Sequence, residues 1–475
     1  MKIAMVASEA KPFCKTGGLA DVTYSLSKEL AIAGEEVIIV MPLYEMIKHA
    51  NCQLEKVDGF DVYMSWRRNA AIIYKTYTDG ITYYLIENDQ YFGRDHIYGD
   101  NDDGERFAFF VMASRELLRR IGNIDIVHVH DWQSAMLPCL VKEDDYYRYE
   151  FRNTKFVLTI HNPAFQGMLD PEALGNLFNL PYSLYERGNC RHDGRISTLK
   201  TGIVYADKIT TVSPNHHYEL LSEWGGMHLD GVLQIRQDDF IGILNGIDYE
   251  EFNPETDPYI PYRFSINNFT SQKKLNKKAL FERLHIVDNG LPLFSMVSRI
   301  TWQKGFDILF DTIEELASKG CNIVVLGSGE YDYEQHLEYL RAKYPNVMAI
   351  YIGYNDELAH LIYASSDFFM MPSLFEPCGL GQMIAQRYGT LPIVRRTGGL
   401  KDSVINYDNN NRLTSNGFGF DNYANDDMRY TSLYALDASK DKNLIKRLKL
   451  NAMKTDNSWQ KSAKQYLSLY HQIID

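Results

Sequence analysis

The chain has few cysteines and no long apolar run. Its six cysteines are scattered, with no Cys-x-x-Cys pair, at Cys14, Cys52, Cys139, Cys190, Cys321 and Cys378. This pattern argues against a disulfide framework or a zinc site and favours a reducing compartment. No run approaches the roughly 18 apolar residues of a membrane span, and Ile3–Ala7 is too short for the core of a signal peptide. We therefore expect a soluble, cytoplasmic protein.

Positive charge is also in short supply. The 475 residues carry 49 Lys and Arg against 62 Asp and Glu, a net charge of −13. This balance argues against nucleic acid as a partner and leaves a neutral polymer or a small anion held in a local basic pocket. One lysine cluster, Lys273-Lys274 with Lys277-Lys278, is typical of a solvated helix face.

What the sequence does contain is a regular alternation of short apolar runs and helical patterns. The runs are Ile3–Ala7, Val37–Met41, Ile124–Val129, Phe156–Ile160, Ile209–Val212, Ile241–Leu244, Leu293–Val297, Ile323–Leu326, Val347–Ile352, Phe368–Met371 and Leu391–Val394. Strand-length runs separated by helices predict parallel sheets built from βαβ units. So many runs exceed one simple sheet, and the length exceeds one ordinary core. The prediction is an α/β fold with two doubly wound domains.

The domain boundary is predicted at Asn245-Gly246-Ile247-Asp248, giving domains over residues 1–244 and 245–456. A last helix, about Trp459 to Ile474 within residues 457–475, is expected to pack back on the first domain. Ligands of such sheets bind at the carboxyl ends of the strands. Two facing domains would therefore share a cleft lined by both sets of strand ends.

The most informative motif, Phe375–Gly381, follows the apolar run Phe368–Met371. It places a carboxylate, Glu376, and a glycine-bearing turn where a buried strand gives way to a helix. The free N–H groups of a helix N-terminus suit a phosphate, whereas the carboxylate suits a hydroxyl-rich sugar. Cys378 has no histidine beside it in the sequence, so a pocket-lining role is favoured over that of a nucleophile.

Two further motifs offer cations near strand ends. In Lys15–Asp21, the glycine pair allows close backbone approach and Lys15 suits a phosphate; a plain glycine turn with a solvated lysine is an equal alternative. Arg299 and Lys304 could neutralise a leaving diphosphate, or be surface charges. No carboxylate cluster for Mg²⁺ stands nearby, so no metal is expected.

Polar residues also follow the strands of the first half. His128 and His130 share one face of a strand that ends at Asp131, which could bind sugar hydroxyls or activate an acceptor. A metal site there lacks a third ligand at suitable spacing. His161-Asn162 offers hydrogen-bonding groups of the kind that sugars need. For each histidine a satisfied strand-end side chain remains the alternative, and His216-His217 is interpreted as a solvated pair.

Together, these motifs resemble the bacterial glycogen synthase and plant starch synthase family. The matching segments cover nearly the whole chain: Lys15–Val22, His128–Trp132, Thr159–Gly167, Thr211–Pro214, Asn245–Asp248, Arg299–Asp307, Pro372–Leu380 and Tyr388–Asp402. The joint occurrence of Lys-Thr-Gly-Gly-Leu-Ala-Asp-Val, Phe-Glu-Pro-Cys-Gly-Leu and Arg-Thr-Gly-Gly-Leu is highly specific.

The resemblance implies a GT-B fold of two Rossmann-like domains facing a central cleft. It implies a retaining, metal-independent glucosyltransferase without a cofactor. Such an enzyme moves glucose from ADP-glucose to the non-reducing end of an α-1,4-glucan such as glycogen. Catalytic roles would fall to Glu376, Lys304, Arg299, His161 and Asp131. Donor and substrate binding would involve Lys15, Gly18, Asp21, Asn162, Asn245, Tyr354, Cys378, Gly379 and Leu380.

Two positions depart from what the resemblance suggests. Related retaining transferases often carry a second Glu eight positions after the first, where this chain has Ile384; its absence fits the glycogen synthase branch. Gly381 stands where the family usually has Thr or Ser, which removes a hydroxyl donor to the terminal phosphate.

Four alternatives stay open. They are a UDP-glucose transferase with a small acceptor, a nucleotide-sugar epimerase, a glucan phosphorylase carrying pyridoxal, and an inactive glucan-binding protein.

Overall fold

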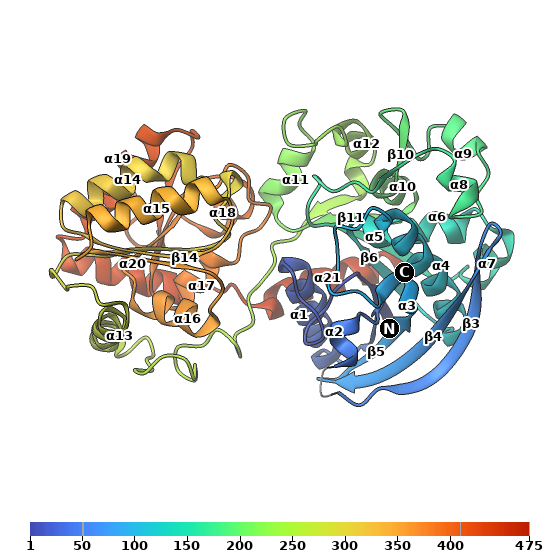
Figure 1. The fold of residues 1–475 in the computed structure, drawn as a ribbon, viewed down its shortest axis with the longest axis horizontal. Coiled ribbons are helices and arrows are strands. Elements are labelled where there is room, and N and C mark those ends of the chain that lie inside the picture. Colours follow the sequence, from blue (N-terminus) through green and yellow to red (C-terminus); the bar gives the residue numbers. More distant parts are fainter. Residues whose placement is uncertain (50–51, 409, 475) are drawn as a thin grey trace. The chain divides into compact units, whose positions relative to one another are not determined.

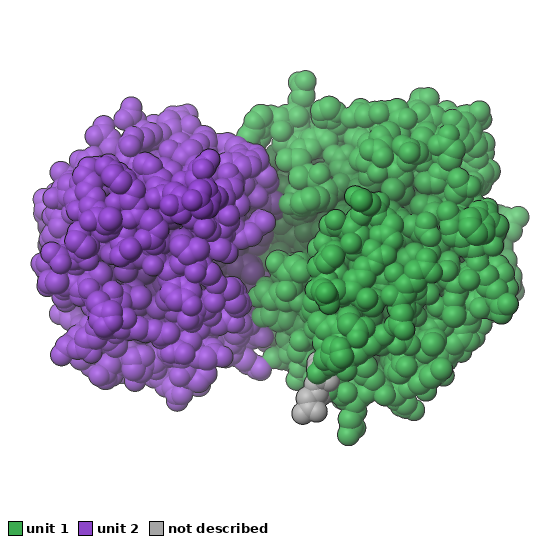
Figure 2. Space-filling view, viewed as in Figure 1, with its two compact units in different colours: residues 1–245, 462–475 green, residues 246–461 purple. Residues whose placement is uncertain are grey.

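A computed structural model describes residues 1–49, 52–408 and 410–474, which form two compact units (Figures 1 and 2). Unit 1 comprises Met1–Asn245 with Ser462–Asp475, and unit 2 comprises Gly246–Lys461. The structure divides the chain after Asn245, whereas the sequence predicted the boundary before Asn245.

Unit 1 is built on a nine-stranded sheet of order β12-β11-β7-β6-β1-β2-β5-β4-β3. From β12 to β5 neighbouring strands run parallel. The strands are β1 (Lys2–Val6), β2 (Glu36–Pro42), β3 (Glu55–Met64), β4 (Arg67–Thr78), β5 (Ile81–Glu87), β6 (Ile126–His130), β7 (Lys155–Ile160), β11 (Lys208–Thr211) and β12 (Phe240–Gly242). A small sheet of order β8-β10-β9 adds β8 (Met168–Leu169), β9 (Arg191–His192) and β10 (Arg195–Ser197).

The helices of unit 1 connect these strands. They are α1 (Gly18–Ile32), α2 (Glu45–Lys48), α3 (Asp89–Phe92), α4 (Asp103–Ile121), α5 (Asp131–Ser134), α6 (Leu137–Lys142), α7 (Asp145–Glu150), α8 (Ala173–Asn176), α9 (Ser183–Glu186), α10 (Thr198–Tyr205), α11 (Pro214–Leu220) and α12 (Asp230–Ile235), with the 3-10 turn η1 (Gln237–Asp239).

The edge formed by β3, β4 and β5 was not predicted. β4 pairs antiparallel with both neighbours, and most residues of β3 are exposed or half-buried. Such strands lack the continuous apolar run of a strand covered on both faces. The two-residue turn Asp79-Gly80, where both residues have positive φ, is a hairpin signal that could have revealed β4 and β5.

Unit 2 contains a six-stranded parallel sheet of order β15-β14-β13-β16-β17-β18. Its strands are β13 (Leu293–Val297), β14 (Asn322–Gly327), β15 (Met348–Ile352), β16 (Phe368–Met371), β17 (Leu391–Arg395) and β18 (Phe418–Phe420). Its helices are α13 (Phe269–Leu284), α14 (Phe306–Ser318), α15 (Tyr331–Lys343), α16 (Asp356–Ser365), α17 (Gly381–Arg387), α18 (Gly398–Ser403), α19 (Asn425–Ala438) and α20 (Lys442–Lys454), with the 3-10 turn η2 (Trp302–Lys304).

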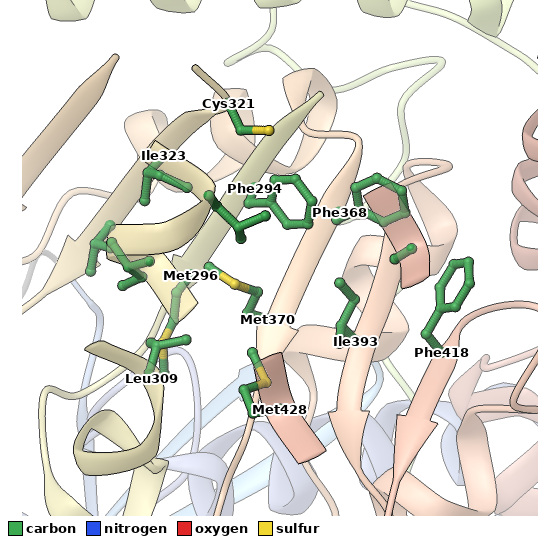
Figure 3. Packing of buried hydrophobic residues seen from close by; sticks show 14 of the residues in the cluster. Phe294, Met296, Leu309, Cys321, Ile323, Phe368, Met370, Ile393, Phe418 and Met428 are labelled. Atoms are coloured by element: carbon green, nitrogen blue, oxygen red, sulfur yellow. The ribbon is translucent and has the colours of Figure 1, made fainter. Parts of the chain in front are cut away.

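Helices cover both faces of this sheet because its strands are apolar on both faces. Phe294 and Met296 of β13 point into a core shared with Leu309 and Met428 (Figure 3). Leu293, on the alternate face, packs with Leu280 and Phe281 of α13 and with α16. This period-2 division places every buried side chain of a strand against one helical layer or the other. The predicted α/β fold is confirmed.

One prediction about α13 is wrong. The side chain of Lys273 is buried, and its Nζ donates to the carbonyl oxygens of Tyr363, Ala364 and Tyr388 and to Thr390 Oγ1. Because a buried ammonium is stable only with acceptors around it, Lys273 is a structural residue of the interior. Lys277 is also half-buried, so only part of the cluster is a solvated face.

The last helix, α21 (Trp459–Ile474), contributes its later residues to unit 1. Ser462 Oγ donates to the carbonyl oxygen of Leu244, and Tyr470 OH lies 2.7 Å from His128 Nδ1. Tyr466 and Tyr470 are fully buried. Within the described residues, no helix combines the length and apolarity required to cross a bilayer.

Candidate active site

In unit 2, Glu376 lies in the turn between β16 and α17 and forms an ion pair with Lys304. Lys304 Nζ lies 2.5 Å from Glu376 Oε2, and Ser373 Oγ donates to the same oxygen at 3.1 Å. Only 15% of the Lys304 side chain and 10% of the Glu376 side chain are exposed. Loops after two adjacent strands, β13 and β16, thus bring together two residues that are 72 positions apart. The sequence predicted both residues for the site, but not this contact.

Gln382 holds the glycine-bearing part of this turn. Its Nε2 donates to the carbonyl oxygens of Cys378 and Gly379 and to Ser403 Oγ, at 3.0–3.1 Å. Gly379 has φ +72, and a Cβ there would meet Gln382 Oε1 at 2.6 Å. Only glycine adopts this conformation without strain and also leaves room for the amide. Sequence reasoning did not single out Gln382, since a glutamine in a first helical turn is usually solvated.

The Thr397–Leu400 turn packs its backbone directly against the Glu376 turn. Gly399 N donates to the carbonyl oxygens of Glu376 and Pro377 at 3.2 and 3.1 Å. A Cβ on Gly398 would lie 2.0 Å from Glu376 O, and one on Gly399 would lie 2.2 Å from Cys378 O. The Arg-Thr-Gly-Gly-Leu motif therefore has a packing reason for both glycines.

Arg299 follows β13 and is exposed. Its guanidinium has no hydrogen bond or ion pair with any residue in the described ranges. The backbone of this loop packs against Gly327 and Gly329. A Cβ at these two positions would lie 1.8 Å from Ser298 O and 2.1 Å from Ile300 O, respectively. These glycines allow two backbone segments to touch.

The other residues predicted for unit 2 differ in exposure. Tyr354, after β15, is 79% exposed, whereas Cys378 is buried; Leu380, at the N-cap of α17, is half-buried. At Gly381, a Cβ would approach the ring of Phe369 to 3.0 Å. This tight contact gives a physical reason for the missing Thr or Ser, because Phe369 occupies the space. Ile384 is buried in α17.

In unit 1, Asp131 connects the ends of β6 and β7. Its Oδ1 accepts from the backbone N–H of His161 at 2.7 Å and of Asn162 at 3.4 Å. Asp131 has φ +56, a left-handed conformation that Asp and Asn tolerate better than other residues. A strained residue at the end of a parallel strand is typical of a functional site. Three residues predicted for the site therefore lie together.

His128, His130 and His161 form a neutral cluster behind Asp131. His130 Nδ1 lies 3.0 Å from His161 Nε2, and the rings of His128 and His130 stack with centroids 4.3 Å apart. Burial lowers the pKa of His128 and of His161 to about 3 and that of His130 well below its ordinary value. His128 bonds to Tyr470 and Thr159, so it is the satisfied strand-end side chain of the alternative interpretation.

No metal site is evident in this cluster. Across residues 1–49, 52–408 and 410–474, no group of three His, Cys, Asp or Glu side chains is arranged to hold a metal ion. The prediction for His216 is wrong: it is buried, with Nδ1 2.7 Å from Thr211 Oγ1, and burial lowers its pKa to about 3.

Glu9 accepts hydrogen bonds from the Lys15–Asp21 loop. Glu9 is buried and accepts from Thr16 N and Thr16 Oγ1 at 2.6 and 2.9 Å. Lys15 and Lys11 both contact Asp21, at 2.9 and 2.5 Å. Glu9 was missed, although its place just after β1 is the signal that identified the other strand-end residues.

The glycines of this loop differ from those of unit 2. A Cβ on Gly17 or Gly18 would meet nothing within 4 Å. Neither residue has positive φ, so the described fold does not itself require glycine at either position. Close approach of a ligand to the backbone would explain them.

Asn245 is buried, and its Oδ1 lacks a hydrogen-bond partner among the residues that the structure describes. Such atoms are rare in proteins and often mark a ligand or water position. Asn162 Oδ1, by contrast, accepts from Ala164 N at 3.0 Å and shapes its own loop.

Asp131 gives a pH-dependent prediction. Burial raises its pKa from 3.8 to about 7, against the opposing effect of the His161 and Asn162 N–H groups. Since the unfolded chain releases this proton near pH 4, the stability contribution is complete below that pH and is lost as pH rises to about 7. Asp131→Asn keeps the left-handed conformation and an accepting oxygen but does not titrate. Between pH 5 and pH 8 we expect the free energy of unfolding of the variant, measured with urea, to rise by on the order of 2 kcal/mol relative to that of wild type.

The comparison isolates Asp131 because both proteins share the other buried acid nearby, Glu9, whose pKa burial also raises. Parallel pH profiles for the two proteins would contradict the prediction. Folding of both at pH 7 is checked by circular dichroism.

Comparison with known proteins adds independent information. Residues 2–235 match the family described as starch synthase catalytic domain, and residues 279–454 match glycosyl transferases group 1. A glycogen synthase of Clostridium kluyveri is 44% identical over 479 residues, covering 100% of both chains. One from Bacillus anthracis is 42% identical over 480 residues, again covering 100% of both.

A solved structure is also similar over the whole chain. The catalytic domain of Starch Synthase IV from Arabidopsis thaliana, bound to ADP and acarbose, superimposes with a TM-score of 0.92 at 32% identity, covering 99% of each chain.

Proposed function

The chain belongs to the glycogen synthase and starch synthase family, and we propose that it extends an α-1,4-glucan with glucose from ADP-glucose. It is a glycosyltransferase with the GT-B fold of two Rossmann-like domains. The observation that carries the proposal is 44% identity to a glycogen synthase over the full length of both chains. The acceptor would be the non-reducing end of the glucan, with retention of configuration.

Arg299 and Lys304 are proposed to stabilise the diphosphate as ADP leaves. Arg299 is exposed and lacks a partner within the described part of the chain, so its guanidinium is available to phosphate oxygens. Guanidinium and ammonium groups form strong charge-assisted hydrogen bonds with phosphate. Each contact made mainly in the transition state is worth about 3 kcal/mol. Tyr354, exposed after β15, would lie beside the adenine.

Glu376 is proposed to orient the glucose hydroxyls and to stabilise positive charge as the sugar gains oxocarbenium character. Its Oε2 already accepts from Lys304 and Ser373. These contacts hold the carboxylate in place rather than exposing it as a nucleophile. Cys378, Gly379 and Leu380 would line the sugar pocket, and the acceptor hydroxyl would enter on the face from which ADP leaves.

The residues of unit 1 are proposed to bind substrate. Lys15 and Gly18 would contact the diphosphate, with Asp21 holding Lys15 in place. His161 and Asn245 would contact the transferred glucose, and Asn162 belongs to the same strand end. Asp131 would lie on the acceptor side and position His161 through its backbone N–H. We also propose a cytoplasmic enzyme that needs no metal or cofactor, because the family that its motifs resemble is metal-independent.

The donor assay tests the function. The purified chain is given ADP-glucose or UDP-glucose, each with and without glycogen, and both glucan-bound glucose and released nucleotide are measured. We expect kcat/KM for ADP-glucose to exceed that for UDP-glucose by about tenfold or more, the result of some 1.4 kcal/mol of differential binding.

Each alternative predicts a different outcome of this assay. A UDP-glucose transferase would reverse the donor preference and accept a small sugar. An epimerase would convert donor without glycogen, and a phosphorylase would depend on phosphate and show pyridoxal absorbance. Glycogen binding without transfer from either donor would indicate a binding protein.

A further inference from the structure

We propose that unit 2 holds a second ligand site: a lysine-lined cavity between α13 and α20 that binds a small phosphate-bearing molecule, such as a sugar phosphate. The cavity has a volume of about 660 Å³, within the usual range for metabolite sites. Leu291, Pro292, Asp367 and Phe368 line it, so it lies at the amino ends of β13 and β16. Glu376 and Arg299 follow the carboxyl ends of these same strands, at the opposite edge of the sheet.

The cavity concentrates positive charge in an otherwise acidic chain. Six lysines line it, against two carboxylates, Asp288 and Asp367, whereas the whole chain has a net charge of −13. The lysines are Lys273, Lys274, Lys277, Lys442, Lys446 and Lys449. Because like charges repel, a cluster of this kind costs stability unless an anion offsets it.

The internal contacts of the cavity leave part of this charge uncompensated. Lys277 and Lys449 both pair with Asp367, at 3.1 and 2.7 Å. Lys273 is held by four neutral oxygens. Its pKa is lowered well below the ordinary value by burial and then by the charge of Lys449.

The remaining three lysines are exposed at the cavity. Among the described residues, Lys442 donates only to the carbonyl oxygen of Ser439. Lys274 and Lys446 have no hydrogen bond or ion pair with any of residues 1–49, 52–408 or 410–474. They come from facing helices and are available to a ligand.

A second, independent observation is the hydroxyl of Ser365. Ser365, at the end of α16, is one of the residues that line the cavity and is only 2% exposed. Its Oγ has no hydrogen-bond partner among the described residues. Buried hydroxyls are nearly always bonded, so this atom is one that a ligand oxygen would satisfy.

An adjoining cavity supplies room for the organic part of the ligand. It has a volume of about 770 Å³ and shares Phe269, Thr270, Lys274 and Lys446 with the first. Its other lining residues include Ile266, Leu450 and Lys454. The two unpaired lysines therefore stand where the cavities join, a position from which ammonium groups can reach a phosphate while apolar side chains contact the rest of the ligand.

The test is calorimetric titration of the full chain with fructose 1,6-bisphosphate and with inorganic pyrophosphate. Saturating ADP is present throughout, so that the diphosphate site of the proposed reaction is occupied. We expect one further site per chain for at least one probe. Lys274→Glu with Lys446→Glu should weaken it at least about tenfold, since repulsion replaces attraction. Ser365→Ala should weaken it about fivefold, the usual effect of one hydrogen bond.

The matched control is Lys278→Glu with Arg447→Glu, which makes the same change of charge on the same two helices. Both residues are exposed and line neither cavity, so binding should stay within about twofold of wild type. The proposal would be overturned if neither probe bound to the wild-type chain. Unchanged binding in the Lys274 and Lys446 variant, or an equal loss in the control, would overturn it as well. Thermal unfolding of each variant confirms that it is folded.

Discussion

Replacing Glu376 by Gln is expected to lower kcat about 10²–10³-fold, because the carboxylate is proposed to stabilise positive charge that develops only in the transition state. Lys304→Met should have a comparable effect. KM for the donor should change much less than kcat in Glu376→Gln. The measurement is steady-state glucose transfer from ADP-glucose to glycogen.

The ion pair makes the double variant informative. Lys304 Nζ lies 2.5 Å from Glu376 Oε2, so each residue loses part of its role when the other is replaced. The kcat of the double variant should therefore lie at most about tenfold below that of the less active single variant. This loss is much smaller than the product of the two single effects. Glu338→Gln, on helix α15, is the control and should keep the wild-type kcat. Near-wild-type kcat in both single variants would refute the assignment.

Gly399→Ala is expected to lower kcat about 10²-fold without unfolding the protein. An added Cβ would lie 2.2 Å from Cys378 O and 2.6 Å from Cys378 Cα. Both are backbone atoms, so the turn that carries Glu376 must move rather than a flexible side chain. Displacement of a catalytic group by about 1 Å can cost 10²-fold in rate. We expect kcat to fall clearly, whereas the midpoint of thermal unfolding should change little.

A matched glycine distinguishes this effect from a general cost of alanine. Gly231 is the second residue of helix α12, and an added Cβ would meet nothing within 4 Å. Gly231→Ala should leave kcat unchanged and raise the free energy of unfolding by up to about 1 kcal/mol through helix propensity. If Gly399→Ala retained full activity, the close packing of the two turns would not matter to the reaction.

Where apolar runs are buried on both faces, the sequence predicted the strands closely. The bounds Leu293–Val297 and Phe368–Met371 agree with β13 and β16. The predicted run Ile241–Leu244 instead became the shorter β12 (Phe240–Gly242). β3 and β4 were missed because these partly exposed strands carry polar residues between the apolar ones.

Side-chain environments were harder to predict than strands. Glu376 and Lys304 could be identified singly, since each follows a strand, but their contact depends on β13 and β16 being neighbours in the sheet. Lys273 and His216 were assigned to solvent because their own segments are polar. Lys273 bonds to Thr390, 117 positions along the chain, whereas His216 bonds to Thr211, only five residues before it, at the buried end of β11. Such environments are set by topology, which local patterns do not contain.

The contact of Tyr470 with His128 has a consequence for biosynthesis. These residues are 342 positions apart, and the later one lies near the end of the chain. During translation the ribosome releases the strands of unit 1 long before α21, and domains generally fold as they emerge. Here, however, the buried ring of His128 can bond to the Tyr470 hydroxyl only after α21 has been synthesised. Unit 1 is therefore completed only after unit 2 has been synthesised.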